Sequence, residues 1–137
     1  MTLKAAEVKA GDSRSQVVAE SLTRTQIVQY AGASGDYNPL HTDEPFAREV
    51  AGYPGVFAHG MLTMGLTARV VTDWVGEERL AEYGVRFAAQ VWPGDTLTAT
   101  ATVESAEDGV VRFTVRTTNQ KGDVVLTGRA VARLEAG

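Results

Sequence analysis

The spacing of hydrophobic residues changes along the chain, from a helical period in the first half to a period of two in the second. Residues 61–75, MLTMGLTARVVTDWV, are apolar on almost every side, and their only charges, Arg69 and Asp73, lie four positions apart. Charges with this spacing share one stripe of a helix. The pattern therefore predicts a helix that is buried on most sides and is terminated by Gly76.

Two shorter helices are predicted before this one. Thr23 can cap a helix that runs to about Ser34, because a threonine oxygen accepts a hydrogen bond from the main chain of the first turn. Thr42 or Asp43 can begin another helix in the same way, and that helix is expected to run to about Val50.

The segment between these two helices, GASGDYNPLH, is predicted to be a loop. Gly32 and Gly35 allow backbone angles that other residues rarely adopt, and Pro39 disfavours helical geometry at Asn38. We therefore expect residues 34–41 to be non-helical and tightly shaped.

Beyond Gly76 the hydrophobic period becomes two, which is typical of half-buried strands. Turn-forming residues at 108–109 and 121–123 separate the last three strands, so these strands are expected to form an antiparallel meander. A further short strand is expected near 16–22, where Val17-Val18 gives a weaker signal. The four main predicted strands cover residues 85–91, 97–103, 111–115 and 124–132.

These elements predict an α+β fold, because an apolar helix followed by antiparallel strands packs most simply when the sheet curls around the helix. The 137 residues have the size of one domain and contain no linker or repeat, so residues 1–137 are expected to form a single domain. A small sheet leaves its edges unpaired, and two subunits commonly pair along such an edge. We therefore expect a homodimer.

Composition excludes several classes of function. The chain has no cysteine, which excludes disulfides and thiol chemistry and fits the reducing cytoplasm. A net charge of -4 and an isoelectric point near 5.1 provide no general attraction to nucleic acid. The N-terminal segment lacks the apolar core of a secretory signal, and no stretch predicts a transmembrane helix. A cytoplasmic protein without nucleic-acid or membrane partners is expected.

Residues suited to acid–base chemistry gather in one part of the sequence. Asp36 and His41 lie five positions apart on the constrained loop, and His59-Gly60 stands where the long helix begins. A carboxylate and an imidazole can hold one water and transfer its protons, and a free N–H at a helix start can stabilise an oxyanion. Addition of water to a 2-enoyl thioester requires these groups, and their closeness in sequence favours closeness in space.

A plainer interpretation of the same residues stays open. Asp, Asn and Pro are common in turns, so residues 36–39 can be only a loop, and His59 can be only a packing residue. The two histidines lack a supporting set of ligands in the sequence, which disfavours a metal enzyme. The glycine-containing loops also lack the strand and helix context of a dinucleotide-binding motif.

The segment TRTQIVQYAGASGDYNPLHTDEPFAREVAGYPGVFAHGMLTMGL closely resembles the hydratase signature of the MaoC-like and R-specific enoyl-CoA hydratase family, in which D-x-N-P-x-H is followed by A-H-G-M. The similarity continues more weakly to about Ala130. It implies a hot-dog fold and the reversible hydration of trans-2-enoyl thioesters to (R)-3-hydroxyacyl thioesters in fatty-acid or related acyl metabolism. Coenzyme A or acyl carrier protein would carry the acyl group, and no further cofactor is implied.

The resemblance also implies roles for individual residues. Asp36 and His41 would activate water, the N–H of Gly60 would bind the oxyanion, and Asn38 would hold the loop in shape. Which member of the Asp36–His41 pair takes the proton stays open, since the two groups would titrate as a unit. Contacts with the substrate are expected from Asn38, His59, Tyr37 and Phe57.

Other functions of the same fold are alternatives. A hot-dog thioesterase would bind the same carrier, but such enzymes often place a carboxylate on the central helix, and no Asp or Glu stands between Gly60 and Thr72. A non-catalytic binding subunit would be expected to lack Asp36 or His41, and both are present. The sequence also resembles the catalytic subunit of mycobacterial 3-hydroxyacyl-carrier-protein dehydratases, which pair with a second hot-dog chain, so a heterodimer is the alternative to a homodimer.

Basic residues in and between the last strands have two interpretations. They can include a phosphate-binding group for coenzyme A, or they can form a solvated strand face. The residues concerned are Arg112, Arg116, Lys121, Arg129 and Arg133.

Overall fold

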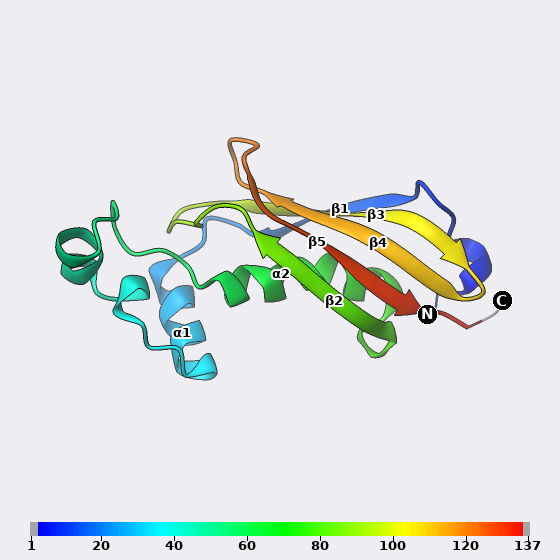
Figure 1. Cartoon of the computed structure of the whole chain (residues 1–137), viewed down its shortest axis with the longest axis horizontal. Coiled ribbons are helices and arrows are strands. Elements are labelled where there is room, and N and C mark those ends of the chain that lie inside the picture. Colours follow the sequence, from blue (N-terminus) through cyan, green and yellow to red (C-terminus); the bar gives the residue numbers. More distant parts are fainter. Residues whose placement is uncertain (1–2, 136–137) are drawn as a thin grey trace.

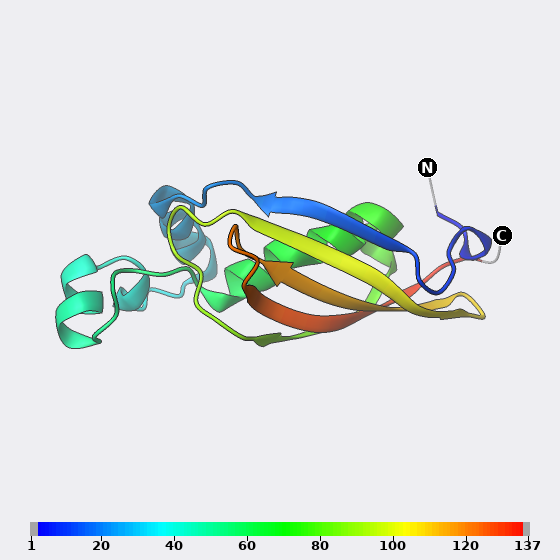
Figure 2. The same ribbon diagram turned by 90° about the horizontal axis from the view of Figure 1, so that it is seen from above.

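The computed structural model describes residues 3–135, which form one antiparallel sheet with a long helix, α2 (Gly60–Val75), along one of its faces (Figures 1 and 2). The spatial order of the strands is β1-β3-β4-β5-β2, and every neighbouring pair is antiparallel. The sheet curls around α2, so the predicted α+β hot-dog arrangement is confirmed. The strands are β1 (Ser13–Ala19), β2 (Leu80–Phe87), β3 (Leu97–Glu107), β4 (Val110–Thr118) and β5 (Val124–Arg133).

The remaining helices are short, apart from the eleven-residue α1. They are η1 (Ala5–Glu7), α1 (Arg24–Ser34), η2 (Pro39–His41), η3 (Phe46–Val50) and η4 (Glu77–Arg79). Thr23 caps α1 as predicted, and its side chain accepts a hydrogen bond from the main chain of Gln26. None of the helices among residues 3–135 is both long and apolar enough to cross a membrane. Figure 1 shows that α1 and the segment through η3 extend beyond one end of the sheet.

One prediction for the region before α2 needs correction. The segment 34–41 is not entirely non-helical, because Pro39–His41 forms a single 3-10 turn that begins where the Asn38 side chain caps it. Asn38 itself has the predicted non-helical geometry, with a ψ of 124°, and proline is compatible with the first position of the turn that follows. The second short helix begins after Asp43 and ends at Val50 as predicted, with π geometry over Phe46–Val50, and Asp43 accepts a hydrogen bond from the main-chain N–H of Phe46.

The core lies between α2 and the concave face of the sheet. Val70, Val71 and Val75 of α2 are buried there against alternate residues of the central strands. The helix is buried or half-buried on most sides, as predicted, and its exposed stripe contains Arg69 and Asp73 together with Met61 and Gly65. The sheet covers the opposite side of α2. The strand residues that form the inner layer include Leu97, Ala99, Ala101, Val103, Val111, Phe113 and Val115.

The last three strands, β3, β4 and β5, form the predicted meander, but the strand before them was placed too late. β2 begins at Leu80 and ends at Phe87, whereas residues 88–91 form a loop in which Val91 is still buried. The alternation of hydrophobic residues begins already at Ala81 and continues into this loop, so it does not fix the ends of the strand. The early strand predicted at 16–22 exists, and it covers Ser13–Ala19. β1 and β2 are the two edges of the sheet.

Candidate active site

A glycine at the end of α1 directs the chain into the loop that carries Asp36. Gly35 has a φ of 78°, a left-handed conformation that glycine adopts without the steric penalty of a Cβ. The main-chain N–H of Asp36 then donates a hydrogen bond to the Ser34 hydroxyl at 3.1 Å. The end of α1 therefore fixes the main-chain position of Asp36, and with it the starting point of the Asp36 side chain.

Two successive side-chain turns shape the rest of the loop. Asp36 Oδ1 accepts a hydrogen bond from the N–H of Asn38 at 3.2 Å, and Asn38 Oδ1 accepts one from the N–H of Leu40 at 3.0 Å. Asn and Asp commonly stabilise turns in this way. Asn38 therefore holds the loop in shape with its side-chain oxygen, and His41 follows at the end of the resulting turn.

His41 has a defined tautomer because of its hydrogen bond to the opposite segment. Its Nδ1 lies 2.6 Å from the main-chain oxygen of Phe57. A carbonyl oxygen can only accept, so Nδ1 carries the proton and Nε2 keeps its lone pair. Burial lowers the pKa of His41 below its usual value of 6.5, and the neighbouring His59 lowers it further, against the opposing effects of the Phe57 carbonyl and Asp36. The neutral base form is therefore favoured.

His59 forms the second of two hydrogen bonds that join the loop of Asp36 and His41 to the residues just before α2. Its Nε2–H donates to the main-chain oxygen of Asp36 at 3.0 Å, while its ring stacks on that of His41 with centroids 3.8 Å apart. Only 2% of His59 is exposed, and Tyr30 packs edge-on against it. The loop with Asp36 and the start of α2 are thus joined by both histidines.

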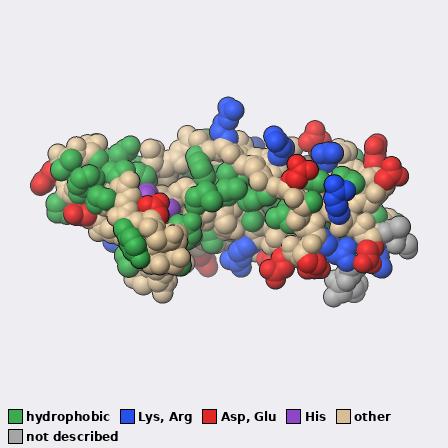
Figure 3. Space-filling model, turned by 60° about the horizontal axis from the view of Figure 1, so that its bottom comes forward, with side chains coloured by type: hydrophobic (Ala, Val, Ile, Leu, Met, Phe, Trp, Pro, Cys, Tyr) green, Lys and Arg blue, Asp and Glu red, His purple; other side chains and the backbone are tan. Residues whose placement is uncertain are grey.

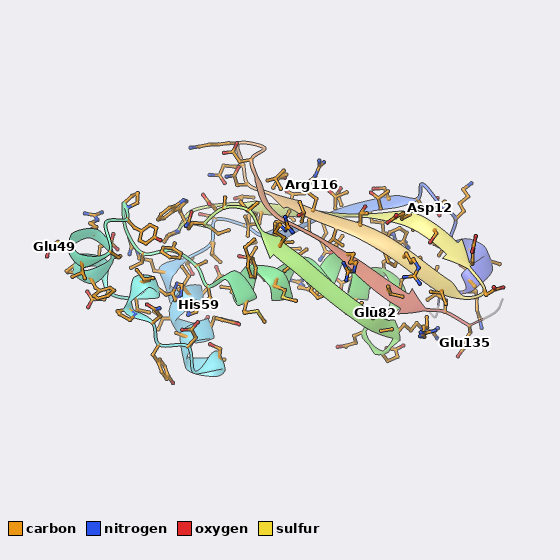
Figure 4. The ribbon with its side chains drawn as sticks, viewed as in Figure 1. Asp12, Glu49, His59, Glu82, Arg116 and Glu135 are labelled. Carbon is orange, nitrogen blue, oxygen red and sulfur yellow. The ribbon has the colours of Figure 1, made fainter. Side chains whose placement is uncertain are left out.

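Gly60 begins α2 directly after this pair. As the first residue of the helix, it has an N–H without an acceptor inside the helix. The ring of Phe87 packs on Gly60, and a Cβ at this position would lie 3.1 Å from its Cζ. Figure 4 labels His59 at this end of α2, close to α1. An N–H without an acceptor inside the helix is therefore present at the helix start, beside the Phe87 ring, where the helix dipole favours negative charge.

A small cavity of about 270 Å³ opens at Gly60. Seven of its ten lining residues have hydrophobic side chains, which suit contact with a hydrocarbon chain, and polar atoms make up about half of the exposed wall. In the space-filling view, a small area of histidine is visible between hydrophobic and acidic side chains (Figure 3). The lining residues are Phe57, Ala58, Gly60, Thr63, Phe87, Ala88, Ala89, Gln90, Val91 and Val125.

Comparison with known proteins identifies the family of the chain. The family model described as MaoC like domain matches residues 5–125, which is most of the chain. The chain belongs to the MaoC-like family. The resemblance seen in the sequence is therefore confirmed at the level of the family.

Individual relatives of this MaoC-like chain are similar over different lengths. It is 34% identical to the (R)-specific enoyl-CoA hydratase of Rhodospirillum rubrum over 95% of the chain and 90% of that protein. It is 43% identical to the enoyl-CoA hydratase ChsH3 of Mycobacterium tuberculosis over 67 residues, which is 47% of the chain and 23% of the length of ChsH3. The unliganded R-hydratase PhaJ1 of Pseudomonas aeruginosa superposes with a TM-score of 0.86 and 25% identity, over 99% of the chain and 88% of PhaJ1.

The MaoC-like site gathers three groups that bind metals in other proteins. Asp36, His41 and His59 can each place a ligand atom within 4.8 Å of the others. The two imidazoles are stacked, however, so their in-plane lone pairs run side by side and do not converge on one ion at the roughly 2 Å that zinc requires. This arrangement suits a hydrogen-bonded water between a carboxylate and one imidazole better than a metal.

The other residues singled out in the sequence have varied surroundings. Phe57 contacts His41 through both its carbonyl and its ring and lines the cavity, whereas Tyr37 is 70% exposed at the loop surface. Phe87, which covers Gly60, is not among the residues singled out in the sequence. Its place at the end of an edge strand, 27 positions after Gly60, gives no local signal that the two residues meet.

Proposed function

We propose that this MaoC-like chain is a hydro-lyase that adds water reversibly to trans-2-enoyl thioesters and gives (R)-3-hydroxyacyl thioesters. One observation carries the proposal: the hydrogen bond from His41 to Phe57 leaves Nε2 of His41 as a base beside the carboxylate of Asp36. The (R)-specific hydratase of Rhodospirillum rubrum, similar over nearly the full length, supports the same reaction and its stereochemistry.

In the hydration direction, Asp36 and His41 hold one water between them. Its oxygen attacks C3 of the enoyl group, and one of its protons passes to the pair. A proton from the pair is then delivered to C2, so the product gains one hydroxyl and one hydrogen and the enzyme is unchanged. Dehydration follows the same steps in reverse.

Negative charge develops on the thioester oxygen when water attacks. We place this oxygen at the N–H of Gly60, where the helix start supplies a donor without an acceptor inside the helix. Removal of one such donor typically costs about 3–4 kcal/mol of transition-state stabilisation. The acyl chain would then enter the cavity at Gly60, which Phe57 and Phe87 line.

Coenzyme A or acyl carrier protein would carry the acyl group, and the side chains described above suffice for the chemistry without a resident cofactor. Activity should therefore survive dialysis against EDTA. We further propose that the protein acts in the cytoplasm, since a chain without cysteine fits a reducing compartment.

We also propose that the chain acts as a homodimer paired along β2. This strand is an edge of the sheet, and hydrophobic side chains lie exposed near it and near the site, with Met61 at 57% and Phe87 at 50% exposure. Pairing of two subunits along β2 would cover both the unpaired strand edge and these exposed hydrophobic side chains. A heterodimer with a second hot-dog chain would use the same edge, and sedimentation of the purified chain distinguishes the two.

The reaction can be tested with the purified chain alone. Loss of enoyl absorbance should be seen with crotonyl-CoA and with a longer 2-enoyl-CoA, and chiral analysis should find the R alcohol. An S product, or no turnover by a folded homodimer with either substrate or with the acyl-carrier-protein form, would overturn the proposal.

A further inference from the structure

The face of the sheet turned away from α2 contains a groove that the proposed reaction does not use. Its volume is about 830 Å³, and neither Asp36, His41 nor Gly60 lines it. In Figure 4, Arg116 marks this sheet region, while His59 lies at the end of α2. The groove is lined by Gly84, Val85, Arg86, Thr100, Thr102, Thr114, Val115, Arg116, Thr127, Gly128 and Arg129.

Strand register places the outward side chains of the groove in two rows across β3, β4, β5 and β2. One row contains Thr100, Arg116, Thr127 and Arg86. The other contains Thr102, Thr114, Arg129 and Gly84. Ser15 and Ser13 of β1 extend the rows, with hydroxyls 2.8 and 3.3 Å from those of Thr100 and Thr102. The two rows thus offer hydroxyls and three guanidinium groups.

The three arginines of the groove lie close together without acidic partners. No Asp or Glu is among the residues that line the groove, and over residues 3–135 none of the three arginines forms an ion pair. Arg129 is the diagonal neighbour of both Arg116 and Arg86 on adjacent strands, a separation of about 7–8 Å. Like charges so placed repel each other, and an anion between them would remove that repulsion.

Gly84 leaves room beside these arginines. A Cβ at this position would meet no heavy atom within 4 Å, so the second row ends in open space next to Arg129. Gly84 lies within β2, where strand backbone accepts ordinary side chains. A larger residue here would fill the groove while the strand stays intact.

We propose that this groove binds the diphosphate group of a nucleotide. Guanidinium groups form paired, charge-assisted hydrogen bonds with phosphate oxygens, and threonine hydroxyls add further donors. The volume falls in the range of small-molecule sites, about 300–1,000 Å³. The nucleotide is either free or the end of a coenzyme A thioester, and the second source rests on the proposed function. Several Lys and Arg side chains project along the upper rim of the sheet half of the molecule in Figure 3.

Calorimetric titration with ADP, and separately with inorganic pyrophosphate, tests the groove directly. At low ionic strength ADP should bind the native chain, and Arg129→Gln or Gly84→Val should weaken binding about tenfold or more. Arg112→Gln removes the same charge from the same face outside the groove, and it should change the affinity less than about threefold. Arg129→Gln should not lower the melting temperature, because it removes repulsion.

Three results would overturn the proposal. The first is the absence of ADP and pyrophosphate binding, and the second is binding that Arg129→Gln and Gly84→Val leave unchanged. The third is binding to phosphatidylserine vesicles without binding to ADP, which would assign the arginines to a membrane surface. These binding measurements do not depend on hydratase activity. A groove that does not bind nucleotide can therefore be distinguished from a chain that does not catalyse the proposed reaction.

Kinetics then identify the source of the nucleotide. If the groove holds the end of coenzyme A, Arg129→Gln should raise KM for crotonyl-CoA and ADP should compete with this substrate. If the ligand is a free nucleotide, Arg129→Gln should leave KM for crotonyl-CoA unchanged while it weakens ADP binding.

Discussion

The imidazole rings of His41 and His59 stack with their centroids 3.8 Å apart and their planes inclined by 25°. Each ring also donates a hydrogen bond to a main-chain oxygen of the opposite segment, His41 to Phe57 and His59 to Asp36. The pair therefore holds the loop with Asp36 against the start of α2. A second ring at this distance also opposes a positive charge on His41.

We predict that His59 acts through the position of Asp36. His59→Leu should lower kcat on the order of 100-fold, because the loop loses its hydrogen bond and the reacting groups shift. His59→Gln keeps an N–H near the position of Nε2 and should retain most of kcat. Steady-state kinetics with melting curves check this, and equal kcat in the native and Leu variants would contradict it.

The pH dependence of kcat/KM should follow the neutral form of His41. Burial, the largest effect, lowers its pKa below 6.5, so the acid limb should fall below pH 6.5. His59→Gln removes a group that lowers this pKa and should move the limb upward. A limb above pH 6.5 in the native chain would contradict the assignment of His41 as the base.

The same shift affects stability. Because the folded state binds the proton of His41 less readily than the unfolded state, unfolding takes up protons as the pH falls below 6.5. The free energy of unfolding should therefore decrease from pH 7 towards pH 5 more in the native chain than in His41→Gln. Urea denaturation at several pH values measures the difference, and identical slopes would argue against a lowered pKa.

Gly60 offers a test of the oxyanion donor with a matched control. Gly60→Pro removes the N–H at a helix position that accepts proline, and the ψ of 137° at His59 is compatible with a following proline. Gly60→Ala keeps the N–H but brings a Cβ against Phe87 in the same way. We predict that kcat is lower in the Pro than in the Ala variant by about 100- to 1,000-fold. Equal losses would show that crowding, not the donor, matters.

The proposed dimer predicts that a charge at Met61 causes dissociation. Met61 is 57% exposed on the uncovered stripe of α2, and Met61→Glu should convert the dimer to monomer in sedimentation velocity. Val17→Glu is the control, since Val17 is 54% exposed but lies on β1 at the other edge of the sheet. Dissociation by both variants, or by neither, would contradict pairing along β2.

Sequence patterns predicted those features that depend on the types of neighbouring residues in the chain. The α1 cap at Thr23 and the turn at Asp108-Gly109 follow from residue type, and the latter has positive φ values of 53° and 77°. The bounds of β2 did not follow, because the alternation of hydrophobic residues runs from Ala81 through the strand into the loop that follows, and few residues of the strand are buried. The exposed stripe of α2 could be predicted at Arg69 and Asp73 but not at Met61 and Gly65, since the exposure of an uncharged residue depends on which faces other elements cover.

The candidate site shows the same division. Asp36, His41 and His59 could be selected from the motif, and they do lie together. The tautomer of His41 depends on the carbonyl of Phe57, which no side-chain pattern reveals. The contact of Phe87 with Gly60 depends on how β2 ends over α2, so only the three-dimensional structure shows it.

The most direct test of the proposed mechanism is kcat/KM for crotonyl-CoA in Asp36→Asn, His41→Ala and the double variant, each checked for folding by circular dichroism. If both groups hold one water, each single change should lower kcat/KM by about 100- to 10,000-fold. In the double variant, kcat/KM should be no more than about threefold below that of the less active single variant, since the effects of removing two groups that act as a unit are not additive. A folded single variant with native activity, or losses that multiply in the double variant, would contradict the shared-water mechanism.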